Sequence, residues 1–388
     1  MRYYLGVMKI FNKYSVFTVI QRILWFCLAL GIFAFLYTLL HFSYIPWRWY
    51  LGVVGLLLCL LVLTGWWAFR SRRLLLQITG IILSAIVSLV CFVGAWYLPT
   101  LQGRILSIFQ IEEAAKLPLE QPFTIYIAGN DQEGKLSTTG RYDVNMMVSI
   151  NFQTHSVLIT SIPRDSYLPN PAYSYQKDKL THMGLNGIDN SMLTLSNTFA
   201  TSLQHYVIVN FTTFRNIVNA LGGVHVQNPY AFASSLTDKY TYPEGNLLLT
   251  GDEALFYVRE RFNLVAGDFD RNAHQVIMLR SILKEMLQPQ KILLLDKVFQ
   301  ALQGNFLTNV DPTAIQNLLQ YELDYLPDWN IINYHIRGGT GSSPCSSHGG
   351  EILSVVYPYE EDIRFIRRQL FALQQDIPLI QQELPSQR

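Results

Sequence analysis

The N-terminal quarter of the chain alternates long apolar stretches with short basic ones. Three stretches contain no charged residue, and they cover residues 23–47, 49–69 and 74–103. Each is long enough for an α-helix to cross about 30 Å of hydrocarbon, which takes about 20 residues. A single stretch could be a buried helix of a soluble protein, but three in succession with charges only between them favour a membrane. We therefore predict a membrane anchor at residues 1–103, with transmembrane helices at about 23–45, 50–69 and 74–98.

The basic residues around these stretches predict how the anchor is oriented. The tail before the first stretch holds four Lys or Arg, the second loop holds three, and the first loop holds only Arg48. Lys and Arg gather on the cytoplasmic side of membrane proteins. The first stretch is too long for a cleaved signal peptide, and no small-residue cleavage site follows it. We expect a multi-pass protein of the cell membrane with a cytoplasmic N-terminus and an extracellular C-terminal domain.

After a connector at 104–121, the pattern changes to short β-rich runs and segments of helical spacing. The β-rich runs predict strands at 123–128, 144–150, 156–162 and 205–211, and near 331–336 and 352–357. Apolar spacing of three and four predicts helices at 190–203, 212–222 and 270–287, and near 291–303, 312–321 and 359–374. Residues 230–249 and the Gly/Ser-rich 338–350 are expected to be loops. This alternation predicts an α/β domain at 122–388, an α/β/α sandwich whose sheet is covered by helices on both faces.

Charge is distributed unevenly between the two parts of the chain. Residues 1–103 contain eight basic and no acidic residues, so the remainder has 21 basic and 28 acidic ones, a net charge of 21 − 28 = −7. The 50% apolar composition excludes a disordered chain, and an acidic domain argues against a nucleic-acid partner. Only Cys345 lies after residue 103, so the domain has no intramolecular disulfide and depends on its core.

Two carboxylates lie where the first two strands of the domain meet one loop. Asp131 follows the first strand, and Asp143 directly precedes the second. In open α/β sheets, ligands bind beyond the carboxyl ends of strands. Carboxylates at the two feet of one loop can share a hard divalent cation such as Mg²⁺.

Arginines gather around the same predicted edge. Arg164 follows the third strand, Arg259 and Arg261 are two residues apart, and Asp268, Arg271 and Gln275 share a helix face by their spacing of three and four. With Arg141 this makes five arginines, whose guanidinium groups bind phosphate oxygens in bidentate fashion. They indicate a di-anionic ligand, although for any one pair a surface salt bridge remains the simpler interpretation.

Other common site chemistries have no signature here. The histidines lack metal-ligand spacing, and Ser161 and Ser166 lack the glycines of a nucleophile elbow. Neither a Walker loop nor a G-x-G-x-x-G motif occurs. Covalent catalysis and nucleotide binding of those kinds are therefore not indicated.

Seven collinear segments together resemble the LytR-CpsA-Psr family of cell-wall phosphotransferases. They are GND (129–131), RYDVNMM (141–147), SIPRDSYLP (161–169), KDKLTHMGLNGID (177–189), YVIVNFTTFRNIVNALGGVHV (206–226), LTGDEALFYVRER (249–261) and GDFDRNAHQ (267–275). Asn145 stands where many members have Ser or Thr. The branch that the chain resembles most is the streptococcal capsule-type branch, because of this Asn145 variant, the KDKLTH segment and the three apolar stretches. Some members of that branch carry an accessory domain, for which the about twenty residues between the third apolar stretch and the first strand leave no room.

The resemblance implies transfer of a glycan from a polyprenyl pyrophosphate to peptidoglycan outside the membrane, with Mg²⁺ and release of polyprenyl phosphate. The glycan is then a capsule, teichoic acid or related wall polysaccharide. By position, Asp131 and Asp143 match the metal-associated acids. The pyrophosphate-binding set matches Arg141, Arg164, Lys179, Arg259, Arg261, Asp268, Arg271 and Gln275. Asp131, Asp143, Arg164 and Arg271 are expected to be catalytic, and one of the two acids is expected to accept the proton of the attacking hydroxyl.

Two alternatives remain open from the sequence. The first is a hydrolase acting on the same donor, with water in place of the sugar acceptor. The second is a non-catalytic binder or regulator of a lipid pyrophosphate. The predicted topology argues against a transcriptional regulator, because it leaves only a short tail and one small loop in the cytoplasm.

Overall fold

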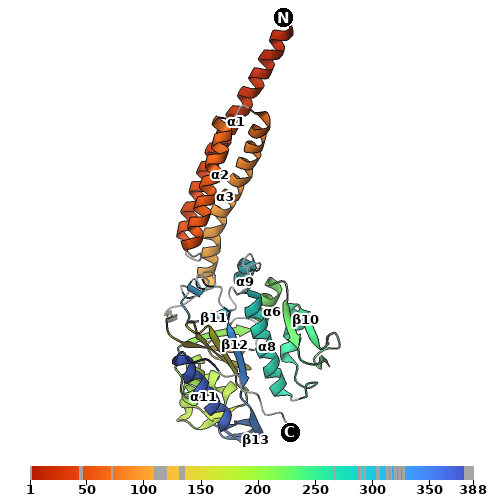
Figure 1. Cartoon of the computed structure of the whole chain (residues 1–388). Coiled ribbons are helices and arrows are strands. Elements are labelled where there is room, and N and C mark those ends of the chain that lie inside the picture. Colours follow the sequence, from red (N-terminus) through yellow and green to blue (C-terminus); the bar gives the residue numbers. More distant parts are fainter. Residues whose placement is uncertain are drawn as a thin grey trace. The chain divides into compact units, whose positions relative to one another are not determined.

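The computed structural model describes residues 2–42, 47–70, 73–108, 120–130, 136–265, 267–286, 294–302, 306–311 and 328–379, and single positions between 287 and 327 (Figure 1). The chain divides into two compact units. One contains residues 1–104 and 316–326, and the other contains residues 105–315 and 327–388.

The first unit contains the three predicted apolar helices. They are α1 (Arg2–His41), α2 (Trp47–Phe69) and α3 (Leu74–Ile108). The segments long and apolar enough to span a membrane are Val19–His41, Arg48–Phe69 and Leu75–Gly103. Leu28, Ile32 and Leu57 are buried between helices, whereas Phe33 and Leu75 are 70% and 73% exposed. Outward-facing large apolar side chains are typical of helices whose solvent is lipid. The helix α3 continues to residue 108, into the predicted connector, whose residues 109–119 lie outside the described part.

A six-stranded mixed sheet forms the middle layer of the second unit. Its order is β11-β6-β1-β2-β3-β12. The strands are β1 (Phe123–Asn130), β2 (Val144–Asn151), β3 (Ser156–Ser161), β6 (His205–Asn210), β11 (Phe306–Thr308) and β12 (Asn330–His335). The strand β1 is parallel to β6 and antiparallel to β2, while β3 is antiparallel to β2 and parallel to β12. Four strands, β1, β3, β6 and β12, therefore run in one direction and end at the same edge of the sheet.

Helices cover both faces of this sheet, which confirms the predicted α/β/α sandwich (Figure 1). Because side chains alternate along a strand, Tyr126, Met147 and Leu158 face one core cluster. That cluster is shared with α5 (Ile188–Phe199) and α11 (Glu360–Gln374). Met146 and Ile159 face the opposite cluster, which includes Val276 of α8 (Asp268–Met286). Two further helices, α6 (Phe211–Ala220) and α7 (Gly251–Arg259), pack with α8 on that side.

Most predicted elements occur close to their predicted positions, but residues 230–249 are not simply a loop. They contain β8 (Phe232–Ala233), β9 (Thr241–Tyr242) and β10 (Gly245–Leu249), of which β10 pairs with β7 (Val224–Asn228). Pro243 and Gly245, whose φ is +108°, break the alternation that would have identified the strands from the sequence. The helix predicted near 291–303 is α9 (Leu295–Leu302). The helix predicted at 312–321 lies mostly outside the described residues.

The Gly/Ser-rich 338–350 is also mostly a strand rather than the predicted loop. It forms β13 (Gly338–Cys345), paired along its whole length with β14 (Glu351–Pro358). Glycine weakens a strand by itself, so here the β-branched partner strand supplies the stability. A Cβ added at Gly341 would lie 2.6 Å from a ring carbon of Tyr357. Glycine at this position therefore lets the Tyr357 ring lie against the hairpin.

Candidate functional site

The edge where β1, β3, β6 and β12 end also holds the start of β2. Backbone hydrogen bonds fasten the segments that arrive there. Asp143 N donates to Gly129 O at 2.8 Å, and Ile162 N donates to Asn145 O at 2.9 Å. Thr181 N donates to the carbonyl oxygen of Arg164 at 2.8 Å, which attaches the segment after β5 (Lys177–Lys179). These bonds explain why Asp143, Arg164 and Lys179, far apart in the sequence, lie together.

Four side chains at this edge form an ion-pair chain, Asp143–Arg164–Asp165–Lys179. Arg164 Nη1 lies 2.6 Å from Asp143 Oδ1, and Arg164 Nε lies 3.7 Å from Asp165 Oδ2. Lys179 Nζ lies 3.1 Å from Asp165 Oδ1. The side chains are between 15% and 29% exposed, so water screens them less than a pair at the open surface. Of the predicted residues, Asp143, Arg164 and Lys179 are thus brought into one cluster.

The other predicted residues divide into three groups. Arg141 Nη2 lies 3.4 Å from His348 Nε2, on the loop after β13. The Arg259 guanidinium lies over the Phe211 ring at 4.7 Å, and that of Arg261 lies over the exposed Phe262 at 4.9 Å. Asp131 lies outside the described residues. Asp268 begins α8, but its side chain is also outside the described set.

Arg271 and Gln275 lie one turn apart on α8, and both are buried, with 8% exposure each. Gln275 Nε2 donates to the carbonyl oxygen of Val258 at 3.3 Å. Its Oε1 is buried without a hydrogen-bond partner among the described residues. A buried amide oxygen without a partner is costly. It is therefore available to a donor group of a ligand.

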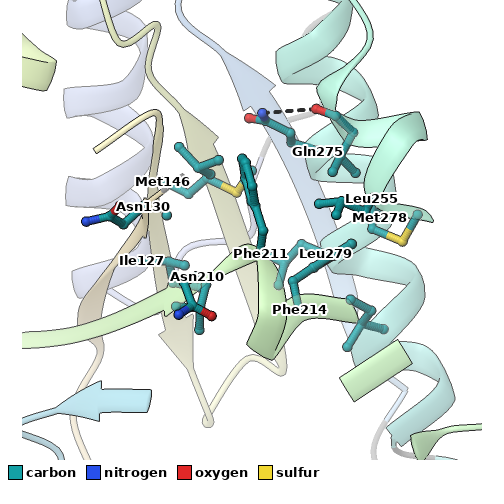
Figure 2. Close-up of a pocket in the computed structure, with 15 residues that line it drawn as sticks. Ile127, Asn130, Met146, Asn210, Phe211, Phe214, Leu255, Gln275, Met278 and Leu279 are labelled. Carbon is teal, nitrogen blue, oxygen red and sulfur yellow. Dashed lines mark hydrogen bonds between the residues drawn. The ribbon is translucent and has the colours of Figure 1, made fainter. Parts of the chain in front are cut away.

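An apolar cavity of about 110 Å³ lies between the sheet and helices α6, α7 and α8 (Figure 2). Met146 lines it on the sheet side, and Leu255, Met278 and Leu279 line it on the helix side. Its few polar lining residues are Asn130, Asn210 and Gln275. Val144, the residue after Asp143, also lines the cavity, as does Phe211, beneath Arg259. The apolar cavity and the ion-pair chain are therefore neighbours.

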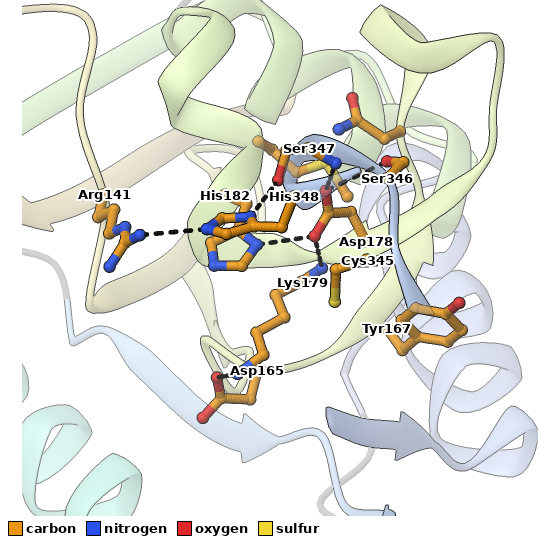
Figure 3. Close-up of polar contacts among 12 residues, drawn as sticks. Arg141, Asp165, Tyr167, Asp178, Lys179, His182, Cys345, Ser346, Ser347 and His348 are labelled. Carbon is orange, nitrogen blue, oxygen red and sulfur yellow. Dashed lines mark hydrogen bonds and ion pairs between the residues drawn. The ribbon is translucent and has the colours of Figure 1, made fainter. Parts of the chain in front are cut away.

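A second polar cluster, absent from the sequence predictions, lies behind Lys179 (Figure 3). One oxygen of the buried Asp178 carboxylate accepts a hydrogen bond from Lys179 N and is hydrogen-bonded to His182 Nδ1, both at 2.7 Å. The other oxygen accepts hydrogen bonds from Ser347 N at 2.6 Å and from Ser346 Oγ at 3.1 Å. Burial alone would raise the pKa of Asp178, but these hydrogen bonds hold it well below its usual range. The carboxylate thus fastens the loop after β13 to β5.

Cys345 belongs to this cluster. It is fully buried at the end of β13, and burial raises its pKa to about 11. Asp178, His182 and Cys345 offer potential ligand atoms within 4.8 Å of one another. Because Asp178 already accepts hydrogen bonds on both oxygens and the thiol is protonated, hydrogen bonding explains this arrangement without a metal.

Sequence reasoning assigned no role to Asp165, which joins Arg164 to Lys179. The available signal was its position, directly after an arginine that ends a strand. The Asp178–Ser347 contact had no such signal, because it links residues 169 positions apart across the unrecognised strand β13.

The sequence and the fold are those of a known family of proteins. The family model of the LytR-CpsA-Psr family matches residues 109–339, and the chain belongs to this family. The polyisoprenyl-teichoic acid–peptidoglycan teichoic acid transferase TagU of Bacillus cereus is 32% identical over 199 residues, 51% of this chain and 64% of that protein. TagU of Enterococcus faecalis is 25% identical over 279 residues, 70% of this chain and 89% of that protein.

Solved structures agree with this fold. The crystal structure of TagV from B. subtilis superposes with a TM-score of 0.55 at 24% identity, covering 67% of this chain and 99% of that one. The structure of TagT bound to LI-WTA gives 0.52 at 22% identity, covering 67% and 93%. The two TagU proteins are named as teichoic acid transferases. They do not support the predicted placement closest to the streptococcal capsule-type branch.

Proposed function

We propose that this protein transfers a wall glycopolymer from a polyprenyl-pyrophosphate carrier to peptidoglycan. The observation that supports this most directly is the ion-pair chain next to an apolar cavity. A lipid pyrophosphate has the same two parts, a charged head next to an apolar tail. Family membership and the teichoic acid transferases among the relatives agree with this activity. The polymer is a teichoic acid, a capsule or a related wall polysaccharide.

The donor is placed with its first isoprene units in the apolar cavity and its pyrophosphate at the strand ends. Arg164 and Lys179 carry two positive charges, which Asp143 and Asp165 neutralise, so the ion-pair chain alone does not balance a di-anion. Arg259 and Arg271, on the cavity side, supply further positive charge, and the amide of Gln275 supplies polar contacts. Arg141, Arg261 and Asp268 complete the proposed binding set. Arginines held in place before the reaction stabilise the charge that develops on the leaving phosphate.

The chemical step is an in-line displacement at the phosphorus that carries the glycan. A sugar hydroxyl of peptidoglycan forms a new P–O bond while the bond to the bridging pyrophosphate oxygen breaks. Polyprenyl phosphate leaves with the bonding electron pair. Asp143, or Asp131 at the other foot of the loop, accepts the proton of the hydroxyl.

The residues present fit a Mg²⁺ ion. Asp143 is a hard oxygen donor, and its backbone is bonded to Gly129, two residues before Asp131. One oxygen of Asp143 is held by Arg164, so the second oxygen can serve as the metal ligand. Bound there, Mg²⁺ supplies charge neutralisation for the phosphates. Removal of divalent ions with EDTA is expected to abolish transfer and Mg²⁺ to restore it, whereas full activity in EDTA would exclude the metal.

The three apolar helices are proposed to anchor the protein in the cell membrane, with a cytoplasmic N-terminus and the α/β domain outside. Four basic residues precede the first uncharged apolar stretch, residues 23–47, and only Arg48 lies between the first two stretches. A reporter fused to the C-terminus should be active only outside the cytoplasm. A C-terminal reporter active in the cytoplasm would overturn this orientation.

The activity is tested with the purified full-length protein, a radiolabelled lipid-pyrophosphate-linked oligosaccharide, a soluble peptidoglycan oligomer and Mg²⁺. We expect label on peptidoglycan, and a loss of about 10²- to 10³-fold in rate for Arg164→Ala. Arg215→Ala is the matched control, because Arg215 pairs with Asp252 on α6 and α7, outside the site. Label released only as a soluble glycan phosphate would identify a hydrolase. Unchanged, tightly bound lipid would identify a non-catalytic binder.

A further inference from the structure

A second hollow, which we call the tyrosine groove, lies on the side of the sheet opposite the apolar cavity. Its volume is about 540 Å³, within the range of about 300–1,000 Å³ typical of ligand sites. Its walls come from the short hairpin of β4 (Tyr167–Pro169) and β5, from β14, and from α5 and α11. These helices cover one face of the sheet, whereas α6, α7 and α8 around the apolar cavity belong to the other face.

The lining of the tyrosine groove combines aromatic rings with hydrogen-bonding groups. Tyr167, Tyr175 and Tyr357 line it, and the last two are 56% and 40% exposed. The rings of Tyr167 and Tyr357 pack edge to face with their centres 5.8 Å apart. Lys177 Nζ lies 5.7 Å from the Tyr167 ring. Polar groups are added by Asn197 and Glu360.

Such a lining suits a chain of sugars. The C–H groups on the face of a pyranose carry slight positive charge, and the face of an aromatic ring is negative, so the two stack. Amide, carboxylate and ammonium groups then bond the hydroxyl groups at the sugar's edge. The neutral tails of a lipid lack those edges, and the groove is too polar for them.

The structure also holds Tyr167 and Tyr357 in place before any ligand binds. Tyr167 OH donates to Pro344 O at 2.7 Å, and Tyr357 OH shares a 2.7 Å hydrogen bond with Ser343 Oγ. Gly341 leaves the space that the Tyr357 ring occupies. Fixed rings lose little entropy on binding.

The tyrosine groove begins at the ion-pair chain. Tyr167 is three residues after Arg164 and pairs across the hairpin with Lys179, which bonds Asp165. Lys177 and Lys179 lie on the same side of β5, about 7 Å apart along the strand. Val356 N, next to Tyr357, donates to the carbonyl oxygen of Asp165 at 2.8 Å. An oligosaccharide in the groove therefore reaches the strand ends within one or two sugar units.

We propose that the tyrosine groove binds the glycan strand of peptidoglycan and presents its hydroxyl to the donor phosphate. This inference rests on the proposed function. In an in-line displacement, the attacking and leaving oxygens lie on opposite sides of the phosphorus. The leaving lipid phosphate is placed on the side of the apolar cavity. The acceptor therefore arrives from the opposite face of the sheet, where the tyrosine groove lies.

The first test measures binding without catalysis. Full-length protein in detergent is titrated calorimetrically with a soluble peptidoglycan oligomer, without donor. Tyr175→Ala with Tyr357→Ala should weaken this binding about tenfold, since two stacking surfaces are lost. The Phe substitutions at both positions keep the rings and should keep most of the affinity, which separates ring loss from misfolding. Tyr173→Ala, a 36% exposed tyrosine of the same loop outside the groove lining, should have no effect.

The second test separates the acceptor from the donor in the transfer assay. The double Ala variant should raise the KM for the peptidoglycan oligomer about tenfold and leave the KM for the lipid donor within twofold. A rise in the donor KM alone would assign the groove to the transferred polymer, and no change in either KM would exclude a sugar site; each outcome overturns the proposal. If the wild-type protein binds the oligomer through these rings but transfers nothing, the groove is still a peptidoglycan-binding site and the proposed function is wrong.

Discussion

The replacement Asp178→Asn tests whether the buried carboxylate holds the loop after β13 on the domain. Asp178 is fully buried, and its two oxygens take four hydrogen bonds, two each. Asparagine has nearly the same shape but only one acceptor oxygen. Its NH₂ group must therefore face either Ser347 N or Lys179 N, both of which are donors. One hydrogen bond is lost and a donor is buried against a donor, whereas the NH₂ group can still donate to the Ser346 hydroxyl or to His182 Nδ1.

The size of the effect follows from these bonds. A hydrogen bond to a charged group contributes about 1.5–3 kcal/mol, and a buried donor left without a partner costs about 1–3 kcal/mol, so together the replacement is expected to cost about 3–6 kcal/mol. For a domain of about 250 residues, 1 kcal/mol shifts the melting temperature by about 2–4 °C, so we expect a decrease of roughly 6–24 °C. Asp165→Asn is the control, because that side chain is 29% exposed and water can replace its partners. It should lower the melting temperature by less than about 3 °C, as for an exposed ion pair.

The pH dependence gives an independent check. Burial opposes ionisation of Asp178, but its hydrogen bonds hold the pKa well below its usual range in the folded protein. A carboxylate with a lowered folded-state pKa contributes stability above its unfolded-state pKa of about 3.9 and loses it as the pH falls toward the folded-state pKa. The difference in melting temperature between the wild type and Asp178→Asn should therefore be constant from pH 8 to pH 5 and shrink below about pH 4. Calorimetry of the full-length protein measures both effects. A decrease smaller than 2 °C at pH 7, with unchanged hydrogen exchange at Ser347, would refute the reasoning.

Three further changes test the rest of the site. Met278→Trp fills the apolar cavity. It should therefore raise the KM for a polyprenyl donor at least fivefold and leave unchanged the KM for a donor whose lipid is replaced by a methyl group. Equal effects on both donors would show that the cavity does not bind the lipid. Lys179→Ala leaves Asp165 with one cation and should lower transfer about 10- to 100-fold without lowering the melting temperature by more than about 3 °C, because the pair is partly exposed. Burial raises the pKa of Cys345 to about 11. In a variant whose other three cysteines are replaced by alanine, Cys345 should resist maleimide at pH 8 while the protein is folded and react once it is unfolded. Rapid labelling of the folded protein would show that the hairpin opens.

The elements that could be predicted from the sequence are those whose own residues determine them. Three apolar stretches, each with the length of a membrane span, identify their helices, and the alternating side chains of β1, β2 and β3 identify the central strands. β13 was missed because its Gly and Ser residues have little strand preference, and its structure depends on pairing with β14. Likewise, the predicted ends of the strands indicated where Arg164 would lie. They did not indicate that Asp165 links Arg164 to Lys179. Such contacts depend on how distant segments pack, and no local pattern encodes them.

The two faces of the sheet suit the two dissimilar substrates that we propose for this site. A mixed sheet with four strands ending together gives a single edge where the ion-pair chain forms, and each face beside that edge is covered by different helices. On one face, α6, α7 and α8 present apolar side chains. On the other, the β4–β5 hairpin and β14 present tyrosines and polar groups. A reaction that joins a lipid-linked phosphate to a sugar needs an apolar and a polar approach to one phosphorus from opposite directions, and this arrangement provides both without moving the charged residues between them.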